Sequence, residues 1–364
     1  MDRNSKSLMF MHKRDVKLDV AKGIGIVLMV IGHTGCPNWL HSSIYSFHMP
    51  LFFIISGLCI GGDKISGAYR EYFYNKVRRL YLPFIQYGLF FYFFDQLRML
   101  ICEDNHSLDI VSLVRDIALI FAMIQTPQLI ACYWFITALF ISSIFAVLVL
   151  KVSKIYMPRY QWLIVPIMLM IMLLLFKYNF HISILLSYKT VYYTTLILLG
   201  YHMKMAIRYM NKYNLPLLGV MCVFICSATF ILFDMSSTPD SPLKLLLRFL
   251  LSTIGSLGVI IISSYLVKHA KHISKFLTYI GGRTMDILTW HFSALRLMNI
   301  FVVLLFALPK DQLAEFPCIS SDPYYWIFFV PASIIISLII GNIIERVKQI
   351  IKYEFTQKSR QADL

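Results

Sequence analysis

The sequence DVAKGIGIVLMVIGH, residues 19–33, is an apolar stretch with ionisable side chains near both of its ends. Lys22 and His33 are eleven positions apart, which is about 16 Å along a helix and roughly half the thickness of a bilayer. Ionisable groups at membrane depth are costly, so they mark candidate functional sites. The stretch therefore predicts a membrane helix that carries an imidazole for chemistry.

The composition of the whole chain agrees with this reading. Of its 364 residues, 58% are hydrophobic and 15% are charged, whereas soluble domains have about 25% charged residues. We expect an all-α, polytopic membrane protein. Ten spans are predicted, at 20–35, 44–61, 80–101, 132–150, 161–177, 183–203, 215–234, 245–267, 285–308 and 324–344.

Three further expectations concern the organisation of the chain. The apolar segment 108–125 carries three charged residues, so we expect it to lie at the interface or to re-enter the membrane. The first apolar stretch lacks a small-residue cleavage site, so it is expected to be retained. The chain divides into a cytoplasmic segment (1–17), a transmembrane domain (18–345) and a cytoplasmic tail (346–364).

The net charge of +15 is explained by topology. Most of the 34 Lys and Arg residues lie at the ends of apolar segments and on alternate connections. This distribution predicts that both termini are cytoplasmic, and it argues against a nucleic-acid partner. The bilayer is the expected environment, in the plasma (cytoplasmic) membrane. The sequence makes no prediction about oligomeric state.

The seven cysteines are too few for a disulfide scaffold. Four of them are expected near the outer face: Cys36, Cys102, Cys132 and Cys318. One or two disulfides would form there in an oxidising compartment, but the sequence does not pair them. No Cys/His spacing resembles a zinc site, and we expect no metal.

Two histidines are the main candidates for chemistry. His33 is expected one or two turns from the outer end of the first span, and His48 follows in the sequence FHMPLFFIISG, residues 47–57. The connection between these spans is short, so both histidines would lie in the outer half and could face each other. A neutral imidazole near working pH can take a hydroxyl proton. The alternatives are a hydrogen-bonded structural histidine for His33 and an interfacial residue for His48.

A basic cluster is expected on the cytoplasmic side. Arg78 and Arg79 begin the third span, and Lys22 begins the first span on the same side. Guanidinium groups bind phosphates in bidentate fashion, so these residues could form an anion site, or they could simply set the topology. Asp19 lies three residues before Lys22 and would orient it or form a plain ion pair with it.

Other polar residues fall within or beside the spans. Trp134 opens the fourth span, where an aromatic belt would also explain it. His291 lies in the ninth span. Arg296 and Lys189 are expected to face the bundle interior, although Lys189 and Arg248 could instead snorkel outward.

Several of these motifs together resemble the integral-membrane acyltransferase-3 family. The resemblance covers most of the chain, and the first three motifs are its specific part. The matching motifs, in order, are Leu18-Asp19 with Lys22-Gly23 and Gly32-His33; His48-Met49-Pro50-Leu51-Phe52-Phe53 with Ser56-Gly57; Arg78-Arg79-Leu80 with Pro83; Trp134-Phe135; and Gly281 with Trp290-His291. The family commonly has Arg at the position of Lys22, and lysine keeps the charge but lacks the bidentate fork.

The resemblance implies transfer of an acyl group, usually acetyl, from cytoplasmic acyl-CoA to a hydroxyl of a cell-surface glycan or lipid-linked saccharide. His33 would be catalytic, as the general base or as the carrier of the acyl group, with His48 beside it. The residues expected to bind acetyl-CoA or another acyl-CoA are Lys22, Arg78 and Arg79. The residues expected to contact the substrate are Asp19, Trp134 and His291.

Two other classes of function remain open on the sequence. A transporter or flippase for a saccharide or its lipid-linked precursor would use the intramembrane charges as a substrate path, although no repeat between the halves is detectable. A non-catalytic scaffold or receptor would leave the histidines unexplained. Consumption of acetyl-CoA by the purified protein would separate an enzyme from both.

Overall fold

The computed structural model describes residues 15–61, 69–102, 109–124, 127–179, 187–210, 213, 215–235, 238–319 and 324–362. This part of the chain contains helices and turns and no strand, so the predicted all-α class is confirmed. The helices are α1 (Val16–Gly32), α2 (Asn38–Leu58), α4 (Tyr69–Lys76), the π-helical turn η2 (Val77–Tyr81), α5 (Leu82–Cys102), α6 (Ile110–Phe121), η3 (Gln128–Tyr133), α7 (Trp134–Tyr156), η4 (Gln161–Leu163), α8 (Ile164–Lys177), α9 (Tyr188–His202), α10 (Lys204–Met210), α11 (Pro216–Leu232), α12 (Pro242–His269), α13 (Lys271–Gly282), α14 (Thr284–Leu305), η6 (Lys310–Ala314) and α15 (Tyr325–Ala362).

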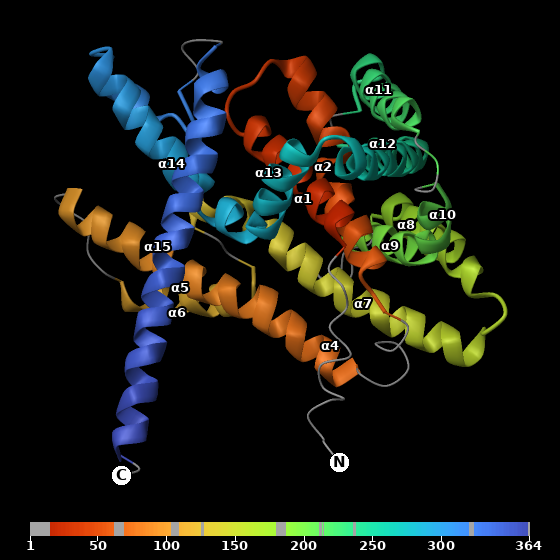
Figure 1. Ribbon diagram of the computed structural model, residues 1–364, viewed down its shortest axis with the longest axis horizontal. Helices are drawn as coiled ribbons and strands as arrows, with labels where there is room; N and C mark the ends of the chain where they lie inside the picture. The colour runs from red at the N-terminus through yellow and green to blue at the C-terminus, as the bar shows by residue number, and fades with distance from the viewer. Residues whose placement is uncertain are drawn as a thin grey trace.

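Helices α1 and α2 occupy the middle of the bundle (Figure 1). Helix α1 packs against α2, α12 and α13, and α2 packs against α9, α11 and α12. The contact between α2 and α9 requires a glycine, because a Cβ at Gly57 would collide with the backbone of Ile197. Small residues at a helix interface allow the backbones to approach this closely.

The turn between α1 and α2 begins earlier than the sequence predicts. Helix α1 ends at Gly32, and the chain reverses through a turn over residues 33–35. Gly35 adopts a φ of 69°, which L side chains rarely adopt. As a result His33 caps the C-terminal end of α1 and does not lie one or two turns inside it.

The burial pattern is that of a membrane protein. On α12 the face turned into the bundle combines small or polar residues with large apolar ones, and the exposed face is mostly large and apolar. The buried set includes Ser252, Ser256 and Ser263, and the exposed set includes Leu243, Leu247 and Leu250. Small residues allow close helix packing in lipid, and the exposed leucines suit contact with acyl chains.

The number of spans remains a prediction. All ten predicted segments overlap helices, although the start of the segment 183–203 lies outside the described residues. Four described helices have the length and apolar composition to cross a membrane: Gln128–Tyr156, Pro242–His269, Thr284–Leu305 and Tyr325–Glu354. Helices over Gln161–Lys177 and Pro216–Leu232 are apolar but shorter. Helix α15 also continues without a break past residue 345, where the transmembrane domain was predicted to end.

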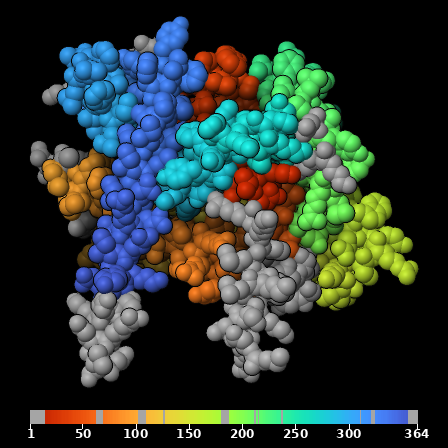
Figure 2. Space-filling view, viewed as in Figure 1, coloured from red at the N-terminus to blue at the C-terminus, as the bar shows by residue number. Residues whose placement is uncertain are grey.

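Three helices lie where the sequence analysis predicts only cytoplasmic connections: α4, α10 and α13. Helix α13 packs along α1, and Figure 2 shows α12 and α13 over part of α1, with α15 to one side of them in this view. These short helices carry charged residues, so hydropathy alone does not reveal them.

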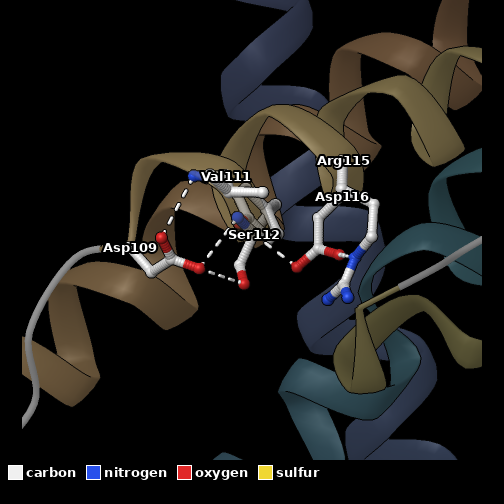
Figure 3. A network of polar contacts seen from close by, with 6 residues as sticks. Asp109, Val111, Ser112, Arg115 and Asp116 are labelled. Atoms are coloured by element: carbon white, nitrogen blue, oxygen red, sulfur yellow. Dashed lines mark hydrogen bonds and ion pairs between the residues drawn. The ribbon is translucent and has the colours of Figure 1, made fainter.

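Helix α6 is too short for a membrane span, as its charges predict. It is 12 residues long, about 18 Å, which is too short to span a hydrocarbon core of about 30 Å. Asp109 caps its first turn by accepting hydrogen bonds from the backbone N–H groups of Val111 (3.2 Å) and Ser112 (3.1 Å) and from the Ser112 hydroxyl (2.6 Å) (Figure 3). The hydrogen bond from the Ser112 hydroxyl, with those from the backbone, lowers the pKa of Asp109 and keeps the cap ionised.

Candidate functional site

His33 lines a cavity of about 900 Å³ between six helices. The walls are formed by the C-terminal end of α1, the middle of α2, the N-terminal parts of α7, α9 and α12, and Leu288 of α14. The backbone N–H of His33 donates to the carbonyl of Val30 (3.0 Å), a 3₁₀-type hydrogen bond that closes the last turn of α1. The carbonyl of His33 accepts a weak contact from the Cys318 thiol (3.6 Å). The end of α1 thus fixes the backbone of His33 beside the cavity.

His48 lines the same cavity. It is buried, and its Nδ1 lies 2.8 Å from the carbonyl oxygen of Ile44, one turn earlier in α2. Because only an N–H can be shared with a carbonyl, Nδ1 is the donor and Nε2 of the neutral ring is an acceptor. The structure therefore brings His33 and His48 together around one space, as the short connection between their helices predicts.

The ring of Tyr45 lies close to three histidine rings. Its ring is 6.4 Å from that of His33, 4.8 Å from that of His48 and 4.0 Å from that of His41, measured between centroids. Sequence analysis missed Tyr45 and His41. The signal was present, because positions 41, 45 and 48 are spaced by four and three residues and so share one face of a helix.

His291 lies behind His33, with ring centroids 5.4 Å apart, and it is not among the residues that line the cavity. Its Nδ1 is 3.1 Å from the carbonyl oxygens of Ile287 and Leu288, so Nδ1 carries the proton. Its Nε2 is buried and has no hydrogen-bond partner among the residues that the structure describes. Ser333 of α15 donates to the backbone carbonyl of His291 (3.3 Å).

Trp134 also lines the cavity, where it is about half exposed. The residues before it fasten this segment to α14: the Cys132 thiol donates to the carbonyl of Leu288 (3.2 Å), and the Tyr133 hydroxyl is 2.6 Å from Oγ1 of Thr289. This attachment places Trp134 on the cavity wall, in addition to any role at the membrane interface.

The residues predicted to bind acyl-CoA lie apart from the cavity. Lys22 forms an ion pair with Asp19 (2.6 Å) on the first turns of α1, and neither residue lines the cavity. Arg78 and Arg79 are exposed in the π-helical turn η2, and no side-chain contact joins them to Lys22 among the described contacts. On α1 the cavity reaches Met29, which is about 10 Å along the helix from Lys22.

The intramembrane cations fall into two groups. Lys189 and Arg248 line the cavity, near the starts of α9 and α12. Arg296 lies further along α14 and donates to the backbone carbonyl of Glu315 (3.1 Å). Sequence analysis left open whether Lys189 and Arg248 snorkel, and the structure places both on the wall of the cavity that contains His33.

The described cysteines are free thiols, with no disulfide among Cys36, Cys59, Cys132, Cys222, Cys226 and Cys318. The side chain of Cys102 lies outside the described residues. Within the described part of the chain, no group of three or more His, Cys, Asp or Glu residues is arranged to hold a metal ion.

Comparison with known proteins identifies the family. A family model described as "Acyltransferase domain" (acyltransferase-3) matches residues 15–342. Two curated relatives are both named "Nodulation protein NolL". The protein from Mesorhizobium japonicum is 31% identical over 144 residues, covering 36% of this chain and 35% of the relative. The protein from Sinorhizobium fredii is 33% identical over 85 residues, covering 20% of this chain and 23% of the relative.

These alignments span 35% and 23% of the curated relatives, whereas the family model spans nearly all of this chain. No solved structure gives a significant match. The matched region contains His33, His48 and His291 together with the helices that hold them. This multi-pass membrane chain belongs to the acyltransferase-3 family.

Proposed function

We propose that this protein is a membrane O-acyltransferase that moves an acyl group, acetyl in the simplest case, from acyl-CoA to a hydroxyl of a glycan or lipid-linked saccharide. The observation that carries the proposal is the position of His33, a partly buried imidazole at the end of a membrane helix on the wall of a 900 Å³ cavity. Cavities of this size accommodate small ligands. Membership of the acyltransferase-3 family supports the same reaction class.

In the proposed reaction His33 accepts the proton of the acceptor hydroxyl as its oxygen attacks the thioester carbonyl. A C–O bond forms and the C–S bond breaks. The departing thiolate of CoA takes the proton from His33. The products are the O-acyl saccharide and CoA, so atoms and charge balance without a further reactant.

His48 and His291 have different proposed roles. The Nε2 of His48 is an acceptor on the cavity wall and would bind a second hydroxyl of the acceptor saccharide. His291 would act through His33, since its partnerless Nε2 can accept an N–H from the imidazole of His33. That hydrogen bond would leave the other nitrogen of His33 as the base. His291 is thus a positioning residue in this proposal.

The donor would enter from the cytoplasmic side, and the protein would reside in the cytoplasmic membrane. The phosphates of CoA would bind the exposed guanidinium groups of Arg78 and Arg79 and the ammonium of Lys22. The distance of about 16 Å from Lys22 to His33 along α1 is comparable to the reach of a pantetheine arm.

The test is acetyl transfer by the full-length protein in lipid vesicles, with a saccharide acceptor and acetyl-CoA. The variant His33→Ala should lose at least about 100-fold in turnover, because general acid–base catalysis contributes 10²–10⁴. The matched control is His272→Ala, which removes an exposed histidine of α13 and should keep full activity.

Full activity of His33→Ala would remove His33 from the chemistry. If the wild-type protein consumed no acetyl-CoA with any acceptor, the transporter reading would take its place. Mass spectrometry of surface glycans from cells with and without the protein would then identify the natural acceptor.

A further inference from the structure

The charged residues on the cavity wall are of one sign. Among the described lining residues these are Lys189 and Arg248, and no Asp or Glu lines the cavity. Retaining cations within membrane helices is costly, and they are usually kept for a ligand or a partner. An acceptor recognised by hydroxyl groups alone would need neither of them.

Lys189 lies where a cation is locally unfavourable. It is in the first turn of α9, whose N-cap is Ser187, and that turn contains no acidic residue. The N-terminus of a helix carries a partial positive charge, so a lysine there is repelled by the backbone dipole. The positive charge of Lys189 and the positive end of the α9 dipole add, and both favour the binding of an anion at this side of the cavity.

Arg248 lies among aromatic residues on the cavity wall. It lies in the second turn of α12, with its guanidinium 5.8 Å from the ring centre of Phe230 and near the phenol groups of Tyr188 and Tyr192. Tyr188 and Tyr192 also line the cavity. The guanidinium and the aromatic faces together offer charge for an oxyanion and apolar surface for a sugar ring.

Two cations near helix starts outside the cavity have carboxylate partners. Lys244 is in the first turn of α12 and pairs with Asp240 (2.6 Å). Arg283 pairs with Asp286 (3.2 Å) and Glu345 (2.8 Å). Lys244 does not line the cavity, although it is one helical turn from Arg248.

We infer that the acceptor is an anionic saccharide, whose carboxylate or phosphate oxygens bind Lys189 and Arg248 while a hydroxyl lies at His33. The inference rests on the proposed acyl transfer and narrows its acceptor class. Charge-assisted hydrogen bonds to both cations would fix the saccharide in one register, and the positive wall would attract it into the cavity.

The experiment compares three trisaccharides: a neutral one, the same one with one C6 hydroxymethyl group oxidised to a uronic acid carboxylate, and the neutral one linked through its anomeric carbon to a lipid diphosphate. Acetyl transfer from acetyl-CoA is measured with the full-length protein in vesicles. We expect kcat/KM to be about tenfold higher for at least one anionic acceptor than for the neutral one. The preferred anion distinguishes a carboxylate from a phosphate source.

The variants Lys189→Gln and Arg248→Gln should each lower kcat/KM for the preferred anionic acceptor about tenfold and leave the neutral acceptor unchanged. Lys189→Arg and Arg248→Lys should retain most of the preference. Lys244→Gln is the matched control and should change nothing. Equal use of neutral and anionic acceptors, or an equal loss for both in the Gln variants, would overturn the inference.

A binding measurement separates this inference from the proposed function. Equilibrium binding of the labelled trisaccharides is measured for the wild-type protein, His33→Ala and the Lys189→Gln/Arg248→Gln double variant. Selective binding of an anionic trisaccharide that survives in His33→Ala and is lost in the double variant supports the anion site even if no acetyl transfer occurs. If no anionic trisaccharide binds selectively, the anion site is refuted, whether or not the protein transfers acetyl groups from acetyl-CoA.

Discussion

At the scale of single residues, the site is defined by which ring nitrogen of each histidine forms a hydrogen bond with a backbone carbonyl. The Nδ1 atoms of His48 and His291 both face carbonyl oxygens of the preceding helical turn, so each ring presents Nε2 as an acceptor. His48 lines the cavity, and the Nε2 of His291 is buried in a ring whose centroid is 5.4 Å from that of His33. Backbone geometry thus sets the tautomers around the proposed base.

The role of His291 can be tested by separating kcat from KM. His291→Leu removes the Nε2 acceptor, and misorientation of His33 should lower kcat by up to about 100-fold with little change in either KM. His291→Gln places an amide near the same position and should recover part of kcat. A rise in both KM values with unchanged kcat would argue instead for direct substrate contact.

The proposed donor site makes a prediction about acetyl-CoA alone. Arg78→Gln/Arg79→Gln should raise the apparent KM for acetyl-CoA about tenfold, because two charged hydrogen-bond donors to phosphate are lost. The KM for the acceptor should not change. Lys154→Gln, which removes an exposed charge from the last turn of α7, is the control. An unchanged donor KM in the double variant would leave the arginines as topology charges.

The sequence located part of the site for a physical reason. His33, His48 and Trp134 could be selected because polar or aromatic groups stand out against apolar helices, and all three line one cavity. The proximity of His33 to His291 could not be derived, since it depends on how α1 and α14 pack. Lys189 and Arg248 were noticed, but their common cavity also depends on helix packing.

At the scale of secondary-structure elements, a short 3₁₀ segment connects two walls of the site. Thr289 donates its hydroxyl to the carbonyl of Met285 (2.7 Å), so the Tyr133 hydroxyl must be the donor to Thr289. This buried hydrogen bond joins η3, and hence the start of α7 with Trp134, to α14.

Removal of the hydrogen bond between Tyr133 and Thr289 should lower the stability of the protein measurably and change its activity little. Tyr133→Phe should lower the free energy of unfolding by about 0.5–1.5 kcal/mol, as expected for one buried hydrogen bond. A double-mutant cycle with Thr289→Val, read from thermal unfolding in detergent, should show a coupling energy of similar size. Additive effects of the two substitutions would show that the bond contributes nothing to the attachment of η3.

The elements were predicted to the extent that they are long and apolar. The segments at 245–267 and 285–308 match α12 and α14 closely. Helices α4 and α13 were not predicted, because short amphipathic helices that carry several charges give a weak hydropathy signal. The end of α1 at Gly32 was missed because it depends on the tight turn at Gly35, which a hydropathy pattern does not register.

At the scale of the whole molecule, the arrangement of charges predicts the orientation in the membrane. With basic connections inside, Asp311 between α14 and α15 lies outside and Glu354 near the end of α15 lies inside. In intact cells a membrane-impermeant maleimide should label Asp311→Cys above the wild-type background, and it should label Glu354→Cys only after permeabilisation. The reverse pattern would show that the orientation is wrong.

The all-α membrane architecture was predictable because backbone groups in lipid must pair within helices, which leaves few alternatives. The number of spans was not, since α8 has 14 residues and α11 has 17, both close to the lower limit for crossing a bilayer. Which apolar segments cross fully therefore depends on tilt and on neighbouring helices more than on hydropathy.

Helix α15 has a mechanical consequence for the site. Its 38 residues make it about 57 Å long, so roughly half of it extends beyond a hydrocarbon core of about 30 Å. The same helix holds the backbone of His291 through Ser333. The N-terminal part of α15 therefore lies beside His33 and His291, and its C-terminal half projects from the bilayer. A bulky tag attached to the C-terminal half would disturb the position of His291 and is not a neutral modification.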